Sequence, residues 1–190
     1  MPAFSIHDQP LPYAAKLPER PADAVTLVVI HCTELPDLAM AREYGEKVLY
    51  DSGAGNSGHY YIDRDGAVYR YVPGTRVAHH VRGWNPQSIG IELVNTGRYP
   101  DWFDSHRQTM AEPYTAAQIA ALQALLALLR SEFPNLRQIA GHEDLDTARV
   151  AASDDPAAQV PRKLDPGPLF PWGAIVPACG LERLRPELER

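Results

Sequence analysis

Two histidines and one aspartate are the residues of this sequence most suited to chemistry, and each follows a short apolar or rigid segment. His31 ends the apolar run 25–30, His142 follows another short apolar run, and Asp165 lies in the turn "RKLDPGP". Two imidazoles and a carboxylate from separate segments match the ligand set of a catalytic zinc, which keeps a fourth position open for water. No compact motif such as HExxH is present. On the residues alone, His31 could therefore be a metal ligand, a catalytic base or a core histidine bonded to backbone.

Glu92 is the second unusual feature, because it lies inside the apolar segment "SIGIELVN". Burying an unpaired carboxylate costs several kcal/mol. We therefore expect that Glu92 either faces solvent through strand alternation or is retained for a function.

The remaining histidines and cysteines are weaker candidates. Cys32 follows His31 on an extended segment, so its side chain should point to the opposite face of the sheet. His59 lies in a predicted hairpin strand and is expected in the core or in a cleft wall, whereas His7 and His106 are expected in solvent. Two cysteines make no disulfide framework.

The segments that carry these residues predict an α/β (mixed α+β) single domain, with a central mixed β-sheet flanked by helices. The long helix should begin with a capping box of Thr115 and Gln118 and bury the face Ile119, Leu122, Leu126 and Leu129. Apolar, β-branched and aromatic runs predict the strands. The expected elements are strands at 25–30, 88–95 and 136–140, a hairpin at 59–72, helices at 37–51, 115–133 and 171–184, and a loop at 144–161.

Composition excludes several classes of protein. The length of 190 residues suits one domain with a proper core. A net charge of -6 argues against general affinity for nucleic acid or anionic membrane surfaces. No apolar run is long enough to span a membrane, and the N-terminus lacks the pattern of a signal peptide. We expect a cytoplasmic monomer.

Five motifs in order along the chain resemble those of the zinc-dependent N-acetylmuramoyl-L-alanine amidases, in particular the AmpD-like branch. The resemblance extends more distantly to phage T7-type lysozyme and the peptidoglycan-recognition proteins, and it covers residues 25–172. The motifs are "VVIHCT", "SGHYYIDRDG", "GWNPQSIGIELVN", "GHEDL" and "RKLDPGPLFPW".

The resemblance implies a role for each matching residue. His31, His142 and Asp165 fall on the zinc ligands, Glu92 falls on the catalytic glutamate, and Lys163 falls on the lysine two residues before the aspartate ligand. It further implies residues 25–190 as the amidase catalytic domain, after an irregular lead-in at 1–24.

Two departures from the family pattern concern the substrate. Where the family commonly has Trp-His-Ala before the "SIGIE" strand, this chain has "VAHHVRGWN". His80 is our candidate for the substrate-side histidine and His79 is the alternative, with Trp84 and Asn85 as further substrate-binding candidates. The stretch between His142 and Lys163 is longer than in the AmpD type, so we expect the loop 144–161 to influence substrate choice.

The function implied by the resemblance is hydrolysis of the amide between N-acetylmuramic acid, in its 1,6-anhydro form, and L-alanine of muropeptides, with Zn²⁺ as the cofactor. Three alternatives remain: a peptidoglycan-binding module without catalysis, a zinc amidase for another acyl-peptide bond, and an amidase acting on intact cell wall. A non-catalytic relative usually lacks a ligand or the glutamate, and this chain has all of them.

Overall fold

The computed structural model describes residues 5–185, and its centre is a seven-stranded mixed sheet with the strand order β1-β4-β3-β5-β2-β6-β9. Neighbouring strands run parallel except β3 and β4, which form the predicted hairpin. The predicted mixed sheet is thus confirmed. The strands are β1 (Ile6–Asp8), β2 (Leu27–Cys32), β3 (Tyr60–Ile62), β4 (Val68–Arg70), β5 (Ser88–Leu93), β6 (Gln138–Gly141), β7 (Arg149–Ala151), β8 (Gln159–Pro161) and β9 (Glu182–Arg183).

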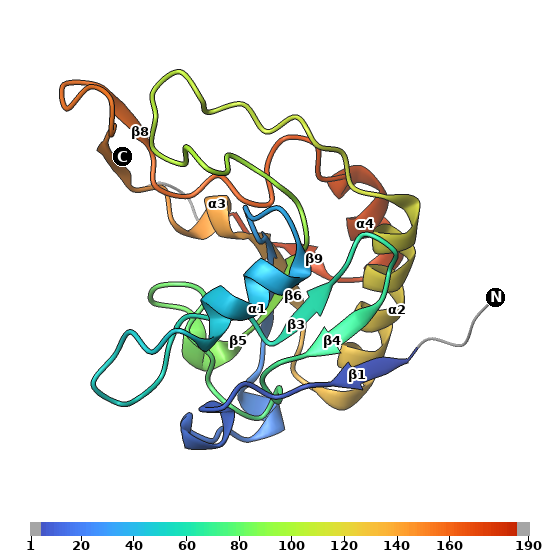
Figure 1. Ribbon diagram of the computed structural model, residues 1–190. Coiled ribbons are helices and arrows are strands. Elements are labelled where there is room, and N and C mark those ends of the chain that lie inside the picture. Colours follow the sequence, from blue (N-terminus) through green and yellow to red (C-terminus); the bar gives the residue numbers. More distant parts are fainter. Residues whose placement is uncertain (1–4, 186–190) are drawn as a thin grey trace.

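Helices cover both faces of this sheet. Figure 1 shows α2 and α4 together on one side and α1 on the other. The helices are α1 (Leu38–Glu46), α2 (Ala116–Glu132), α3 (His142–Leu145) and α4 (Trp172–Cys179), with short 3-10 turns at Ala14–Lys16, Ala22–Ala24 and Asn85–Gln87. No helix in the part of the chain that the structure describes has both the length and the apolar character needed to cross a bilayer.

The long helix α2 forms as its sequence predicts. The Thr115 side chain accepts a hydrogen bond from the Gln118 backbone, and the Gln118 side chain returns one to the Thr115 backbone. The two side chains thereby satisfy N–H groups that a helix start leaves unpaired. Leu125 is fully buried with the predicted leucines, whereas Ile119 is only half-buried. The apolar face of α2 is therefore rotated slightly from the predicted one.

Alternation along β2 and β5 separates an apolar face of the sheet from a functional one. On β2, Val28 and Ile30 join the core beneath α2, whereas Leu27 and Val29 join a smaller apolar cluster on the other face. His31 is the next residue in this alternation, so it lies on the same face as Leu27 and Val29. All six residues of β2 are buried, as expected for a central strand covered on both faces.

Residues 5–24 contribute to the fold more than a wholly irregular lead-in would. β1 pairs in parallel with β4, and Leu11, Tyr13 and Leu17 are buried in a second apolar cluster with Ala41 of α1. This corrects the description of the lead-in as irregular, whereas the boundary between residues 24 and 25 stays a prediction.

Several other elements differ from the sequence expectations. The segment 144–161, predicted as a loop, contains the antiparallel hairpin β7–β8. α1 ends at Glu46 rather than near residue 51. α4 includes Pro177 and ends at Cys179 rather than near residue 184, and Gly180 follows it with a φ of 63° that suits a helix C-terminus. The final strand β9 lies where the sequence predicted the end of the helix 171–184, because two paired residues carry no recognisable periodicity.

Candidate metal and catalytic site

The three predicted ligands meet in one buried cluster. His31 Nδ1 lies 3.0 Å from His142 Nδ1 and 3.0 Å from Asp165 Oδ2. His142 Nδ1 lies 3.1 Å from the same Asp165 oxygen. Their exposed fractions are only 2–3%. The structure thus brings together three side chains from positions 31, 142 and 165.

Parallel strand pairing accounts for this convergence. β2 and β6 are parallel neighbours, with Ile30 opposite Gly141, so His31 and His142 emerge side by side at the carboxyl ends of the two strands. Ligand sites in α/β sheets commonly lie at this edge. Asp165 is held there because the Glu143 backbone N–H donates to its carbonyl oxygen at 2.9 Å.

The donor set fits a zinc ion. Two imidazole nitrogens and one carboxylate oxygen are ligands that zinc prefers, and a tetrahedral ion with bonds of about 2.0–2.1 Å would separate its ligands by roughly 3.3 Å. Asp165 Oδ1 is buried without a hydrogen-bond partner among the described residues. A buried carboxylate needs a compensating charge, and a bound cation would supply it.

The electrostatic setting keeps the ligands in the form that binds metal. Burial lowers the pKa of His31 to about 4, so the imidazole is neutral. Burial alone would raise the pKa of Asp165, but the electrostatic interaction and the hydrogen bond with His142 hold it well below its usual range. A neutral imidazole and an ionised carboxylate are the states in which these groups coordinate zinc.

Glu92 lies beside this cluster because of strand register. His31 and Glu92 are opposite each other in the parallel pair of β2 and β5, and alternation places both on the face away from α2. Gly58 leaves room for the Glu92 side chain, since a Cβ there would lie 2.8 Å from Glu92 Cγ. Burial, reinforced by the negative charge of Asp165, raises the pKa of Glu92 well above its usual range.

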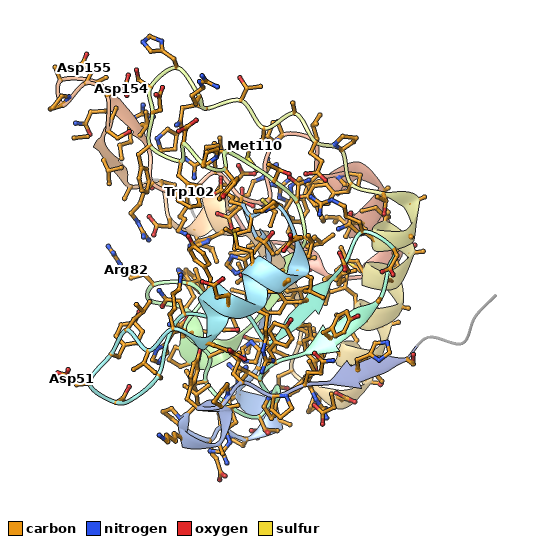
Figure 2. The ribbon with its side chains drawn as sticks, viewed as in Figure 1. Asp51, Arg82, Trp102, Met110, Asp154 and Asp155 are labelled. Atoms are coloured by element: carbon orange, nitrogen blue, oxygen red, sulfur yellow. The ribbon has the colours of Figure 1, made fainter. Side chains whose placement is uncertain are left out.

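Glu92 and the cluster open onto a cleft of about 710 Å³. Lys163 lines this cleft, and its positive charge acts to lower the pKa of Glu92. Four aromatic residues also line it: Tyr44 of α1, Tyr50, Trp102 and Phe103. In the view of Figure 2, Trp102 lies between Arg82, another lining residue, and the hairpin tip marked by Asp154 and Asp155.

The four candidate substrate residues occupy different environments. His79 lines the cleft and packs edge-on against Tyr50, with ring centroids 4.9 Å apart. Asn85 lines the cleft, but its Oδ1 accepts hydrogen bonds from the backbone of His80 and Val81. Trp84 packs in the apolar cluster with Val81 and is not among the residues that line the cleft.

His80 lines the cleft and also lies directly against a predicted metal ligand. Its Nδ1 is 3.0 Å from His31 Nε2. The ring rests on Gly90 of β5, where a Cβ would come within 2.7 Å of the imidazole. The expected core role of His59 agrees with its burial, because its Nδ1 accepts the Gly90 N–H and its Nε2 lies 2.9 Å from the Arg76 carbonyl oxygen.

Sequence reasoning missed a buried ion pair in the cleft wall. Glu34 Oε1 accepts from Arg98 Nε at 2.7 Å, and Glu34 Oε2 accepts from Arg98 Nη2 at 2.9 Å. Both side chains are less than a tenth exposed. Trp102 Nε1 donates to the Glu34 carbonyl oxygen. Charged residues in irregular segments gave no signal of burial, although the stretch "YPDWFD" is aromatic enough to indicate packing.

Comparison with known proteins identifies the class that this fold and site define. A family model described as N-acetylmuramoyl-L-alanine amidase matches residues 21–168, and the chain belongs to this family.

Two curated relatives come from Escherichia coli strain K12. The chain is 34% identical over 113 residues to the N-acetylmuramoyl-L-alanine amidase AmiD, which covers 55% of this chain and 35% of AmiD. It is 34% identical over 125 residues to the 1,6-anhydro-N-acetylmuramyl-L-alanine amidase AmpD, which covers 61% of this chain and 54% of AmpD. The match thus spans about a third to a half of these relatives.

Solved structures share the fold. The N-acetylmuramoyl-L-alanine amidase LysC from Clostridium intestinale URNW superimposes with a TM-score of 0.66 at 22% identity, covering 95% of this chain and all of LysC (100%). E. coli AmiD, in complex with the substrate anhydro-N-acetylmuramic acid-L-Ala-D-gamma-Glu-L-Lys, gives a TM-score of 0.60 at 25% identity, covering 86% of this chain and 59% of AmiD.

Proposed function

We propose that this chain hydrolyses the amide between N-acetylmuramic acid and L-alanine in muropeptides, with the 1,6-anhydro form as its preferred substrate. The observation that carries the proposal is the convergence of His31, His142 and Asp165 beside Glu92 in one cleft. Family membership and the printed names of AmpD and AmiD support the bond and the substrate class.

We propose zinc as the metal, held by His31 Nδ1, His142 Nδ1 and one Asp165 oxygen. In an open site of this kind zinc acts as a Lewis acid, which lowers the pKa of water to about 7 and polarises a carbonyl group. Because the three side chains line the cleft, water and substrate would reach a bound ion from it. Because the ligands come from different elements, only the folded chain presents them together.

Glu92 is the proposed proton carrier. Its carboxylate faces the same cleft as the three ligands, so it can take a proton from the attacking water and pass it to the leaving amine nitrogen. The raised pKa suits this exchange, since a carboxylate of higher proton affinity is a stronger base.

Lys163 is the proposed stabiliser of developing charge. Its ammonium group lines the cleft close enough to influence both Glu92 and Asp165 electrostatically. A positive charge fixed beside the reacting carbonyl lowers the barrier as negative charge grows on the oxygen.

Two other functions are separable by experiment. A peptidoglycan-binding module would bind muropeptides without cleaving them, and an amidase of intact wall would act on sacculi as well as on fragments. Complete retention of the ligand cluster and Glu92 favours an enzyme over a binding module. The predicted cytoplasmic location and monomeric state stay predictions.

Mass spectrometry of reaction products tests the proposal. Purified protein is incubated with an anhydromuropeptide and, separately, with whole sacculi, each with and without a chelator. We expect free peptide beginning with L-alanine from the anhydromuropeptide, and none after chelation. Binding without cleavage of either substrate would contradict the proposal, and faster cleavage of sacculi would overturn the substrate preference.

A further inference from the structure

A chain of hydrogen bonds runs from a backbone carbonyl to the predicted metal cluster. The Ser88 hydroxyl donates to the Trp84 carbonyl oxygen at 2.7 Å. Ser88 Oγ also lies 3.2 Å from His80 Nε2, and His80 Nδ1 lies 3.0 Å from His31 Nε2. The other nitrogen of His31 faces His142 and Asp165.

The Trp84 carbonyl at one end sets the donor and the acceptor of every hydrogen bond in this series. A carbonyl oxygen only accepts, so the single Ser88 hydroxyl proton is used there. Ser88 Oγ must then accept from His80, which places the His80 proton on Nε2. His80 Nδ1 is left with a lone pair, and it accepts from His31 Nε2–H. His31 Nδ1 therefore carries the lone pair that points to the cluster.

The surrounding fold holds the His80 ring in this position. Asn85 Oδ1 accepts from the backbone N–H of His80 at 3.0 Å. Gly90 leaves the space that the ring fills, since a Cβ would lie 2.7 Å from His80 Cγ and Nδ1. Ser88 is fully buried on the same strand as Gly90. The placement of His80 is thus built from β5 and the loop before it.

We propose that His80 is a positioning residue: with Ser88 it fixes the tautomer and ring orientation of His31 so that Nδ1 binds the metal. This inference rests on the proposed function, because it assumes zinc at the cluster. It adds a second role to the expected contact of His80 with substrate, which stays a prediction. Groups that hold the second nitrogen of a ligating histidine commonly matter 10–100-fold for metal affinity.

Zinc affinity of matched variants tests the inference. Dissociation constants are measured by chelator competition for the wild-type protein, His80→Ala, His80→Asn, His80→Gln and His79→Ala. We expect about 10–100-fold weaker zinc binding for His80→Ala. The Asn oxygen falls near the position of Nδ1 and should restore most of the affinity, whereas the Gln amide extends toward Nε2 and should not. His79→Ala, which alters the neighbouring ring, should bind zinc as the wild type does.

Each contrary result has a distinct meaning. Unchanged affinity in folded His80→Ala would overturn the inference, and equal losses in His80→Asn and His80→Ala would overturn the hydrogen bond as the cause. Failure of the wild type to bind zinc would instead defeat the proposed function. Thermal unfolding of the metal-free variants shows whether each is folded.

A spectroscopic measurement on the wild type avoids dependence on variant folding. Nitrogen-15 NMR of the imidazoles in the zinc-loaded protein should show His80 protonated at Nε2 alone and His31 protonated at Nε2. Protonation of His80 at Nδ1 would reverse the direction of these hydrogen bonds and overturn the inference.

Discussion

The floor and the rim of the cleft are built in different ways. The floor, formed by β2 and β5, presents His31 and Glu92 from paired positions of a sheet buried on both faces. The rim is formed by residues 97–113, which the β7–β8 hairpin supports from outside the cleft. Polar contacts join the two, such as Ser153 N to Phe103 O at 2.8 Å and Ser105 N to Asp154 Oδ1 at 2.7 Å.

This difference separates the residues expected to carry the reaction from those expected to influence which substrate is accepted. A residue on the floor cannot move without breaking strand register, because a shift by one residue turns every side chain to the other face. Individual contacts of the rim can be removed without disturbing the sheet. We therefore expect floor substitutions to act on turnover and rim substitutions to act on stability or substrate choice.

The largest effect is expected for Glu92→Gln on the floor. The amide keeps the size of the side chain but cannot accept the proton, so turnover should fall by about 10²–10⁴-fold while zinc content stays the same. Steady-state kinetics and elemental analysis measure the two quantities. Glu43→Gln, an exposed carboxylate of α1, is the control, and equal turnover in both variants would remove Glu92 from the mechanism.

The next largest effect is expected for Glu34→Gln, which removes the partner of Arg98 in the rim. The substitution leaves the buried guanidinium of Arg98 without its charge partner, which should cost about 3–5 kcal/mol of unfolding free energy. Urea denaturation gives the value. Asp8→Asn removes one partner of the exposed Arg70 pair and should cost less than about 1 kcal/mol. Similar losses in both variants would show that the Glu34–Arg98 pair is not effectively buried.

A smaller and pH-dependent effect is expected for Glu112→Gln. Burial opposes ionisation of Glu112, but hydrogen bonds from Arg64 and the Thr96 backbone outweigh it and lower its pKa. The stabilisation is therefore present above the unfolded pKa near 4.5 and is lost as pH falls through the lower folded value. Denaturation at pH 7 should show a loss of about 1 kcal/mol, shrinking toward zero in acid. A loss independent of pH would contradict this assignment.

The smallest effect on catalysis is expected from the hairpin. No residue of 144–161 lines the cleft, but Arg98 Nη1 donates to the Pro161 carbonyl and so connects the hairpin to the wall. Replacing residues 150–160 with a Gly-Ser linker should leave zinc content unchanged and raise activity on sacculi relative to anhydromuropeptide. An unchanged ratio would mean that the hairpin plays no part in selection.

The sequence predicted the floor better than the rim for physical reasons. Strand alternation and parallel pairing are regular, so the positions of His31 and Glu92 follow from local patterns. Glu34 and Arg98 are 64 residues apart in irregular segments, and no periodicity relates them. The environment of His80 was missed because it depends on the space above Gly90, which becomes visible only when the loop is folded onto β5.

Zinc titration of the metal-free protein tests the central claim most directly. Activity on an anhydromuropeptide is followed as zinc is added to wild type and to Asp165→Ala, with bound metal measured in parallel. We predict that wild-type activity rises to a plateau at one zinc per chain and that Asp165→Ala neither binds tightly nor recovers activity. Full activity in the metal-free wild type, or tight binding of one zinc by Asp165→Ala, would contradict the account.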